Sequence, residues 1–261
     1  MEKTKPSFRA VTFNMQHGQQ WDADDPDGAP VDLAKTIAAI RAVTPDVIFL
    51  QEVEKVDPAR GPLDPPPNYT HLRAALPEFQ SVFAYPPPDP AELPFGYGLA
   101  IFAREPLETP RTHILPAPED LTFEFQGRTT RPTARVMLET AMPWDGRRIT
   151  LLNVHLQAFF MIGTSSDIHR GQRDAVAARL AAGDGPTILA GDLNSAPSEG
   201  TVAQFEAQGF RAVPNAIPTW KRMPYVLDHV LHSPALAVGD CHVVPTNAAD
   251  HEMLVADFRF A

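Results

Sequence analysis

Carboxylate, amide and imidazole side chains recur in this sequence where short apolar segments end. Asp192 and Asn194 directly follow the apolar run 187–190, and the other positions are Asn14, Glu52, Asn153 with His155, Asp228, and Asp250 with His251. Oxygen and imidazole ligands without a thiol cluster favour a hard divalent ion over a structural zinc. Mg²⁺ takes one or two carboxylates and keeps positions for water and phosphate oxygens, so this set of side chains could supply a site for Mg²⁺ or Mn²⁺.

The elements that position these side chains are mostly strands. Apolar, β-branched and aromatic composition predicts strands at 8–14, 47–50, 81–85, 98–103, 134–140, 148–155, 187–190, 226–231, 241–244 and 254–260. Helices are predicted from Asp32 to Pro45, over 71–76, from Ser166 or Asp167 to about 182, and over 201–208. The segment 106–126 gives mixed signals and no assignment. Polar residues therefore stand at the ends of buried strands, where a rigid sheet fixes what each strand presents.

Length and charge limit the classes of protein. We expect a single domain over residues 1–261, without an obligate protein partner. The formal charge of −10, from 32 acidic and 22 basic residues, disfavours tight sequence-independent nucleic-acid binding. The single cysteine, Cys241, allows no internal disulfide and fits a reducing compartment, so we expect a cytoplasmic location. The charged segment 1–6 and the absence of a long apolar run predict no signal peptide and no transmembrane segment.

The polar motifs, taken in order, resemble a known superfamily. They are Asn14 after a strand, Leu50-Gln51-Glu52-Val53, Asn153-Val154-His155-Leu156, Gly191-Asp192-Leu193-Asn194, Asp228-His229-Val230 and Ala249-Asp250-His251. Each motif alone is weak, but their order is similar to that of the endonuclease/exonuclease/phosphatase superfamily, the DNase I-like hydrolases, and they span 8–260. The resemblance implies an α+β fold: a four-layer α/β/β/α sandwich of two mostly antiparallel sheets.

The same resemblance implies a divalent-metal-dependent hydrolase of phosphate esters, usually diesters, with Mg²⁺ or Mn²⁺. Carried over by motif, Glu52 is the principal metal ligand, with Asn14 beside it and Asp250 at or near the metal. Asp192 orients or activates the attacking water, Asn194 holds a phosphate oxygen, and His155 and His251 face the phosphate. Asp228 fixes the tautomer of His251. One departure is Gln16, where some relatives carry an acidic residue on the metal side.

Further residues are substrate-binding candidates, and the substrate itself stays open. Asn153 lies on a motif strand, Arg131 belongs to a local basic cluster, and Arg173 opens a predicted helix. Trp220 either walls the pocket or packs in the core. A small phosphate ester, a lipid headgroup and a nucleic acid are all compatible with the motifs. The alternatives are an endonuclease on DNA or RNA, and a catalytically silent binding or scaffold protein on the same fold.

Overall fold

The computed structural model describes residues 7–57 and 61–261. The segment 1–6, on which the expectation of no signal peptide rested, lies outside the described residues. Within them, no helix is both long and apolar enough to cross a membrane.

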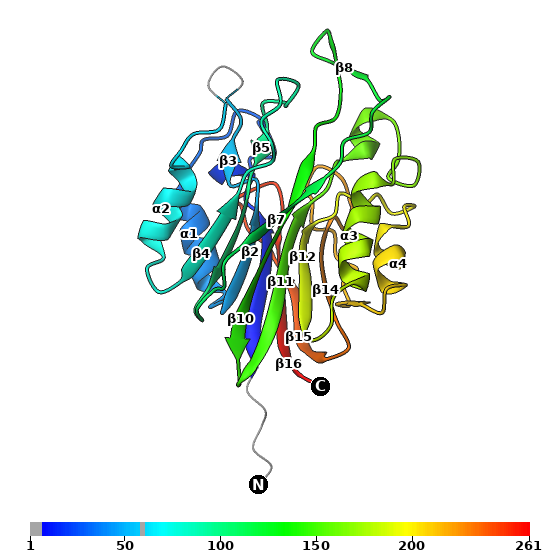
Figure 1. Ribbon diagram of the computed structural model, residues 1–261. Helices are drawn as coiled ribbons and strands as arrows, with labels where there is room; N and C mark the ends of the chain where they lie inside the picture. The colour runs from blue at the N-terminus through cyan, green and yellow to red at the C-terminus, as the bar shows by residue number, and fades with distance from the viewer. Residues whose placement is uncertain (1–6, 58–60) are drawn as a thin grey trace.

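Two six-stranded sheets form the centre of the molecule (Figure 1). The first sheet has, in spatial order, β15 (Leu236–Val244), β16 (Met253–Phe260), β1 (Phe8–Asn14), β2 (Val47–Gln51), β6 (Leu99–Ala103) and β4 (Gln80–Ala84). The second sheet has β13 (Arg211–Ala212), β14 (Asp228–His232), β12 (Thr187–Asp192), β11 (Arg147–His155), β10 (Arg135–Trp144) and β7 (Arg111–Leu115). Neighbouring strands are antiparallel except β1 with β2 and β11 with β12.

Helices cover the outer face of each sheet (Figure 1). On the first sheet these are α1 (Leu33–Ala42) and α2 (Pro67–Ala75), and on the second α3 (Gly171–Ala181) and α4 (Thr201–Glu206). Separate clusters of buried apolar side chains lie under each helical layer. The order helix, sheet, sheet, helix is the predicted four-layer sandwich.

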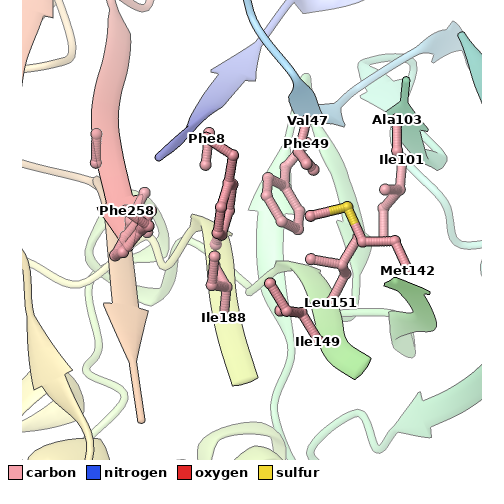
Figure 2. Close-up of a cluster of buried hydrophobic side chains, with 14 of the residues drawn as sticks. Phe8, Val47, Phe49, Ile101, Ala103, Met142, Ile149, Leu151, Ile188 and Phe258 are labelled. Carbon is pink, nitrogen blue, oxygen red and sulfur yellow. The ribbon is translucent and has the colours of Figure 1, made fainter. Parts of the chain in front are cut away.

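The largest apolar cluster fills the space between the two sheets (Figure 2). Phe8 and Phe49 of the first sheet pack toward Leu151 and Ile188 of the second, and all four side chains are fully or almost fully buried. Residues two apart on a strand share a face, so alternate residues fill this space and the others meet the helices. Both sheets are therefore apolar on both faces, and polar side chains cluster where the strands end.

The helix boundaries show where local sequence rules apply and where they fail. Asp32 caps α1 as predicted, because its carboxylate accepts hydrogen bonds from the backbone N–H groups of Ala34 and Lys35. The predicted start of α3 at Ser166 or Asp167 is wrong, since the helix begins at Gly171. The Asp167 carboxylate instead accepts hydrogen bonds from Gly200 N–H and from an arginine of α3.

Two short sheets extend beyond the sandwich at one end (Figure 1). They are β3 (Glu54–Lys55) with β5 (Gly96–Tyr97), and the hairpin of β8 (Phe123–Phe125) with β9 (Arg128–Thr130). Strands β7 and β8 lie in the segment 106–126 that received no assignment. A 3₁₀ turn, η1 (Gln16–Gly18), follows β1, and another, η2 (Phe159–Ile162), follows β11.

Candidate active site

The polar strand ends meet at one edge shared by the two sheets. Because β1 and β2 are parallel, as are β11 and β12, their carboxyl ends lie at the same edge. Strands β14 and β16 run antiparallel to β12 and β1, so they begin there. The site edge, as we call it, collects the residues Asn14, Glu52, His155, Asp192, Asn194, Asp228, Asp250 and His251.

Asp192 is the centre of this group. Its Oδ2 accepts a hydrogen bond of 3.1 Å from Asn14 Nδ2, and lies 3.6 Å from His155 Nε2 and 3.8 Å from His251 Nε2. Its Oδ1 accepts the backbone N–H of Asn194 at 2.9 Å. Asp192 is almost fully buried, and burial is the main cause that raises its pKa to about 7. The carboxylate is thus held from several sides while remaining poorly solvated.

Glu52 lies beside Asp192 and shares a partner with it. Asn14 Nδ2 also donates to Glu52 Oε1 at 3.1 Å, and His155 Nε2 is 3.9 Å from the same oxygen. Burial, followed by repulsion from Asp250, raises the pKa of Glu52 to about 7. The buried carboxylate of Asp192 and the partly exposed carboxylate of Glu52, from different sheets, are therefore bridged by one amide.

A glycine makes room for the Glu52 carboxylate. A Cβ on Gly96 of β5 would lie 2.2 Å from Glu52 Oε2 and 2.4 Å from Glu52 Cβ. Atoms cannot approach so closely, so any side chain at this position would displace Glu52. The backbone of Glu52 is in the left-handed region, with φ +51°. Such a conformation costs of order 1–3 kcal/mol in a residue with a side chain, and it turns the carboxylate toward the site edge.

His251 and Asp228 form a buried ion pair. His251 Nδ1 lies 2.7 Å from Asp228 Oδ2. Burial alone would lower the pKa of His251, but the charge and hydrogen bond of Asp228, with the charges of Asp192 and Asp250, raise it to about 10. This raised pKa favours the protonated imidazole at neutral pH. Its Nε2 lies on the same side of the ring as Asp192, 3.8 Å from Oδ2 of that residue.

His155 has the opposite character. Burial, followed by the positive charges of Arg135 and His251, lowers its pKa well below the ordinary value. The site edge thus offers one neutral and one charged imidazole.

Asp250 is tied to the connection before β14, and its charge raises the pKa of Glu52. It accepts hydrogen bonds from Trp220 Nε1 at 3.2 Å and from Arg222 Nε at 2.8 Å. Its backbone N–H donates to Gln16 Oε1 at 3.2 Å. Gln16 therefore contacts the Asp250 segment through a neutral amide.

The donor set fits a divalent cation. Glu52 and Asp250 repel each other electrostatically in a buried setting, and a cation between carboxylates removes that cost. Asp192, Asp228 and His251 also bring ligand atoms within 4.8 Å of one another. In this second group Nδ1 of the imidazole is held by Asp228, and the surrounding carboxylates raise the pKa of His251, which favours its protonated form over a metal ligand. Glu52 has the amide of Asn14 at 3.1 Å as its side-chain hydrogen-bond partner.

The turn after β12 is fixed by its backbone. Gly191 has φ +148°, and a Cβ there would lie 1.9 Å from the carbonyl oxygen of Val154. Asn194 has φ +44°, and its Nδ2 donates to the carbonyl oxygen of Leu156 at 3.0 Å. The Gly-Asp-Leu-Asn motif therefore packs tightly against the end of β11, which sets the position of Asp192.

The structure corrects the assignment of Asn153 as a substrate-binding residue. Its side chain is fully buried between the sheets, where Nδ2 donates to the carbonyl oxygens of Leu50 and Ala100, both at 2.9 Å. Its Oδ1 accepts a hydrogen bond of 2.7 Å from Gln51. The side chain joins the two sheets below the site and has no polar atom left for a substrate.

The two arginine candidates are held by acids of their own. Arg173 is buried and pairs with Asp167 of the preceding connection. Arg131 is partly exposed and bonds both oxygens of Asp89, at 3.0 and 2.8 Å. The structure does not bring either guanidinium into contact with the residues around Asp192.

Arg135, a member of the same local basic cluster as Arg131 in the sequence, is a charged neighbour of the site. It begins β10 at the site edge, and its positive charge lowers the pKa of both Glu52 and His155. Its guanidinium bonds Glu92 at 2.9 Å and Gln157 at 3.2 Å. The sequence placed Arg135 in a basic cluster and on the predicted strand 134–140, but did not show that it lies closer to the site than Arg131.

A family model and several solved structures match this chain. A model of the Endonuclease/Exonuclease/phosphatase family matches residues 11–251. Among solved structures, an endonuclease/exonuclease/phosphatase from Beutenbergia cavernae is 24% identical with a TM-score of 0.69, covering 99% of this chain and 72% of that one. ANGEL2, a 2′,3′-cyclic phosphatase in complex with adenosine-2′,3′-vanadate, is 13% identical with a TM-score of 0.68, covering 98% and 96%.

A curated relative matches part of the chain. A UPF0294 protein of Yersinia pseudotuberculosis is 31% identical over 119 residues, which is 44% of this chain and 44% of that protein. The match therefore spans less than half the length of the relative.

Proposed function

Because this chain belongs to the endonuclease/exonuclease/phosphatase family, we propose that it is a divalent-metal-dependent phosphodiesterase in which water attacks phosphorus. One observation carries the proposal. The carboxylates of Glu52 and Asp192, which come from different sheets, are bridged by Asn14, and Asp192 lies 3.8 Å from Nε2 of His251, whose pKa is raised. A carboxylate for a metal, a carboxylate for water and a cation for phosphate are the groups that this reaction requires. Members of the family are generally phosphoesterases, and ANGEL2 is a phosphatase by its description.

Each residue has a task in this proposal. Glu52, with Asn14 and Asp250, would hold Mg²⁺ or Mn²⁺, which when bound supplies Lewis acidity toward a phosphate oxygen. Asp192 accepts a hydrogen bond from the attacking water and orients it toward phosphorus. His251 donates from Nε2 to a phosphate oxygen and offsets the negative charge that builds there.

The remaining residues support these three groups. Asp228 keeps the proton on His251 Nδ1 and holds the ring in place. Asn194 and the neutral His155 donate to the phosphate from the side of β11 and β12. Asp192 would not need a high pKa to activate the water, because a bound divalent ion would lower the pKa of that water.

The test is hydrolysis of bis(p-nitrophenyl) phosphate and p-nitrophenyl phosphate with Mg²⁺, with Mn²⁺ and with EDTA. We expect turnover of the diester with metal, none in EDTA, and a loss of at least about 10²-fold in Glu52→Gln and Asp192→Asn. Glu124→Gln is the matched control, because Glu124 is exposed on the β8–β9 hairpin and bonds only the neighbouring strand.

Two outcomes would overturn the proposal. Turnover that persists in EDTA and in both site variants would exclude the mechanism. No turnover on any phosphate ester, with both metals, would favour a silent binding protein on this fold. A panel of plasmid DNA, RNA, phospholipid and sugar phosphates then separates the nuclease alternative from the others.

A further inference from the structure

Large apolar side chains that are exposed to solvent gather at the site edge. Among the described residues eight are largely exposed, and only Ile114 belongs to a strand of the sandwich. The other seven lie on connections that leave the sheets at the site edge, shown at the top of Figure 1. This apolar rim consists of Val31, Leu63, Phe95, Met161, Ile168, Ile217 and Met223, each 39–70% exposed.

The distribution, and not the mere presence of these residues, is informative. Single exposed apolar side chains are normal on soluble proteins. In the part of the chain that the structure describes, however, the connections at the opposite end, 43–46, 76–79, 104–110 and 182–186, contribute none of the eight. Exposed apolar surface concentrated around one site marks a binding surface.

Apolar character continues from the rim to His251. The ring of Phe160, next to Met161 of the rim, packs edge-on against Trp220 at 5.9 Å and Tyr225 at 5.6 Å. Trp220 lies 6.3 Å from the His251 ring. An apolar group attached to the phosphate would therefore find an aromatic wall directly beside the imidazole.

The charges at this end disfavour a polyanion. Ion pairs join most cations near the site to acids: Arg131 to Asp89, Arg135 to Glu92, Lys221 to Glu252, and Arg222 to Asp27 and Asp250. Lys55 and Arg128 are the exposed cations on the short strands at this end. The connection that carries Val31 also carries the exposed acids Asp22, Asp24 and Asp25. A nucleic acid needs several free cations for its phosphates, and an anionic lipid surface attracts basic segments. An uncharged surface fits this face better than either.

We propose that the apolar rim docks on a bilayer of zwitterionic phospholipid and that the phosphodiester hydrolysed at the site edge is in the lipid headgroup. The inference rests on the proposed function. Water attacks phosphorus, one P–O ester bond breaks, and a proton from the water goes to the leaving oxygen, which yields an alcohol and a phosphate monoester. A second copy of the chain is a poorer occupant, since it would cover the site whose substrate must enter.

Vesicle flotation tests docking separately from catalysis. The full chain carrying Glu52→Gln is mixed with phosphatidylcholine vesicles, and with vesicles containing phosphatidylglycerol. We expect flotation with phosphatidylcholine that weakens as phosphatidylglycerol is added. Because one inserted apolar side chain contributes about tenfold in partitioning, Met161→Ser/Ile168→Ser should bind about 10²-fold more weakly.

Ile114→Ser is the matched control, because Ile114 is 63% exposed but lies on β7 within the second sheet. It should bind vesicles as the parent does. In chains with Glu52 intact, the rim variant should hydrolyse vesicle phospholipid more slowly and bis(p-nitrophenyl) phosphate at the parent rate. No flotation, equal loss in Ile114→Ser, or tighter binding to anionic vesicles or to duplex DNA would overturn the docking proposal. Lack of turnover on soluble diester with flotation intact would instead overturn the proposed function.

Discussion

Gly96 offers a sharp test of how the site is built, because it is far in sequence from every motif. Because Gly96 has no side chain, the Glu52 carboxylate can occupy the space next to it. In Gly96→Ala the new Cβ would lie 2.2 Å from Glu52 Oε2, whereas ordinary contacts begin at 3.4 Å. The carboxylate must therefore move by about 1.2 Å, the difference between these values. A displacement of ~1 Å in a reacting group costs about 10²-fold in rate.

The backbone is not the cause of this effect. Gly96 lies outside the left-handed region, so alanine can adopt its conformation without strain. Gly239→Ala is the matched control, since Gly239 also has an ordinary backbone and its added Cβ would meet Asp257 O at 3.5 Å.

The assay is kcat/KM for bis(p-nitrophenyl) phosphate with Mn²⁺, together with Mn²⁺ affinity from calorimetry. We expect Gly96→Ala to lose about 10²-fold in kcat/KM and to bind Mn²⁺ more weakly, while Gly239→Ala matches the parent. A folded Gly96→Ala protein with parental activity and metal affinity would refute the placement of Glu52.

Other perturbations test the electrostatics and the buried polar contacts. Asp228→Asn should bring the pKa of His251 down from about 10 toward its ordinary value and lower kcat/KM by about 10²–10⁴-fold; an NMR titration that still gives a pKa near 10 would contradict this. Folding raises the pKa values of Glu52 and Asp192, so the folded protein holds these protons more tightly than the unfolded chain. The free energy of unfolding is therefore highest below pH 4 with respect to these two groups, and it decreases as the pH rises to about 7. The melting temperature of metal-free protein should fall over that range, and Mn²⁺ should raise it more at pH 8 than at pH 5; equal gains at both pH values would count against a cation at these carboxylates. Asn153→Ala should lower the free energy of unfolding by about 3 kcal/mol in urea, because it leaves buried partners unpaired, with kcat/KM per folded molecule unchanged; a selective rise in KM would restore its role in binding substrate.

The sequence could predict which polar residues lie at strand ends, because strand ends are local features. Runs such as 47–50 and 187–190 are too short for helices, so Glu52 and Asp192 had to follow strands, and the ordered motifs implied that these strands share an edge. The structure confirms the sandwich and places both carboxylates at that edge. The helix cap at Asp32 could also be predicted from the sequence, because its carboxylate bonds backbone N–H groups only two and three residues further along the chain.

The sequence could not show how deeply a polar side chain is buried, or which partner far along the chain it contacts. Asn153 and His155 share a face of β11, as residues two apart must, but only the packing of the first sheet shows that Asn153 lies one layer deeper. Arg131 looked available for phosphate because its partner Asp89 is 42 residues away. Gly96, in a proline-rich connection, carried no signal of its contact with Glu52.

The edge strand β7 was missed for a related reason. Its sequence, Arg111–Leu115, is mostly exposed and lacks the apolar run that marks a buried strand. It pairs with β10 along one side only, so its hydrogen bonds and not its composition define it.

The central claim is that Glu52, and not the group of Asp192, Asp228 and His251, holds the metal. Anomalous diffraction from crystals soaked in Mn²⁺ measures this directly. The account predicts a peak within about 2.2 Å of a Glu52 carboxylate oxygen, and its loss in Glu52→Gln. A peak only among Asp192, Asp228 and His251, or one that persists in Glu52→Gln, would contradict it.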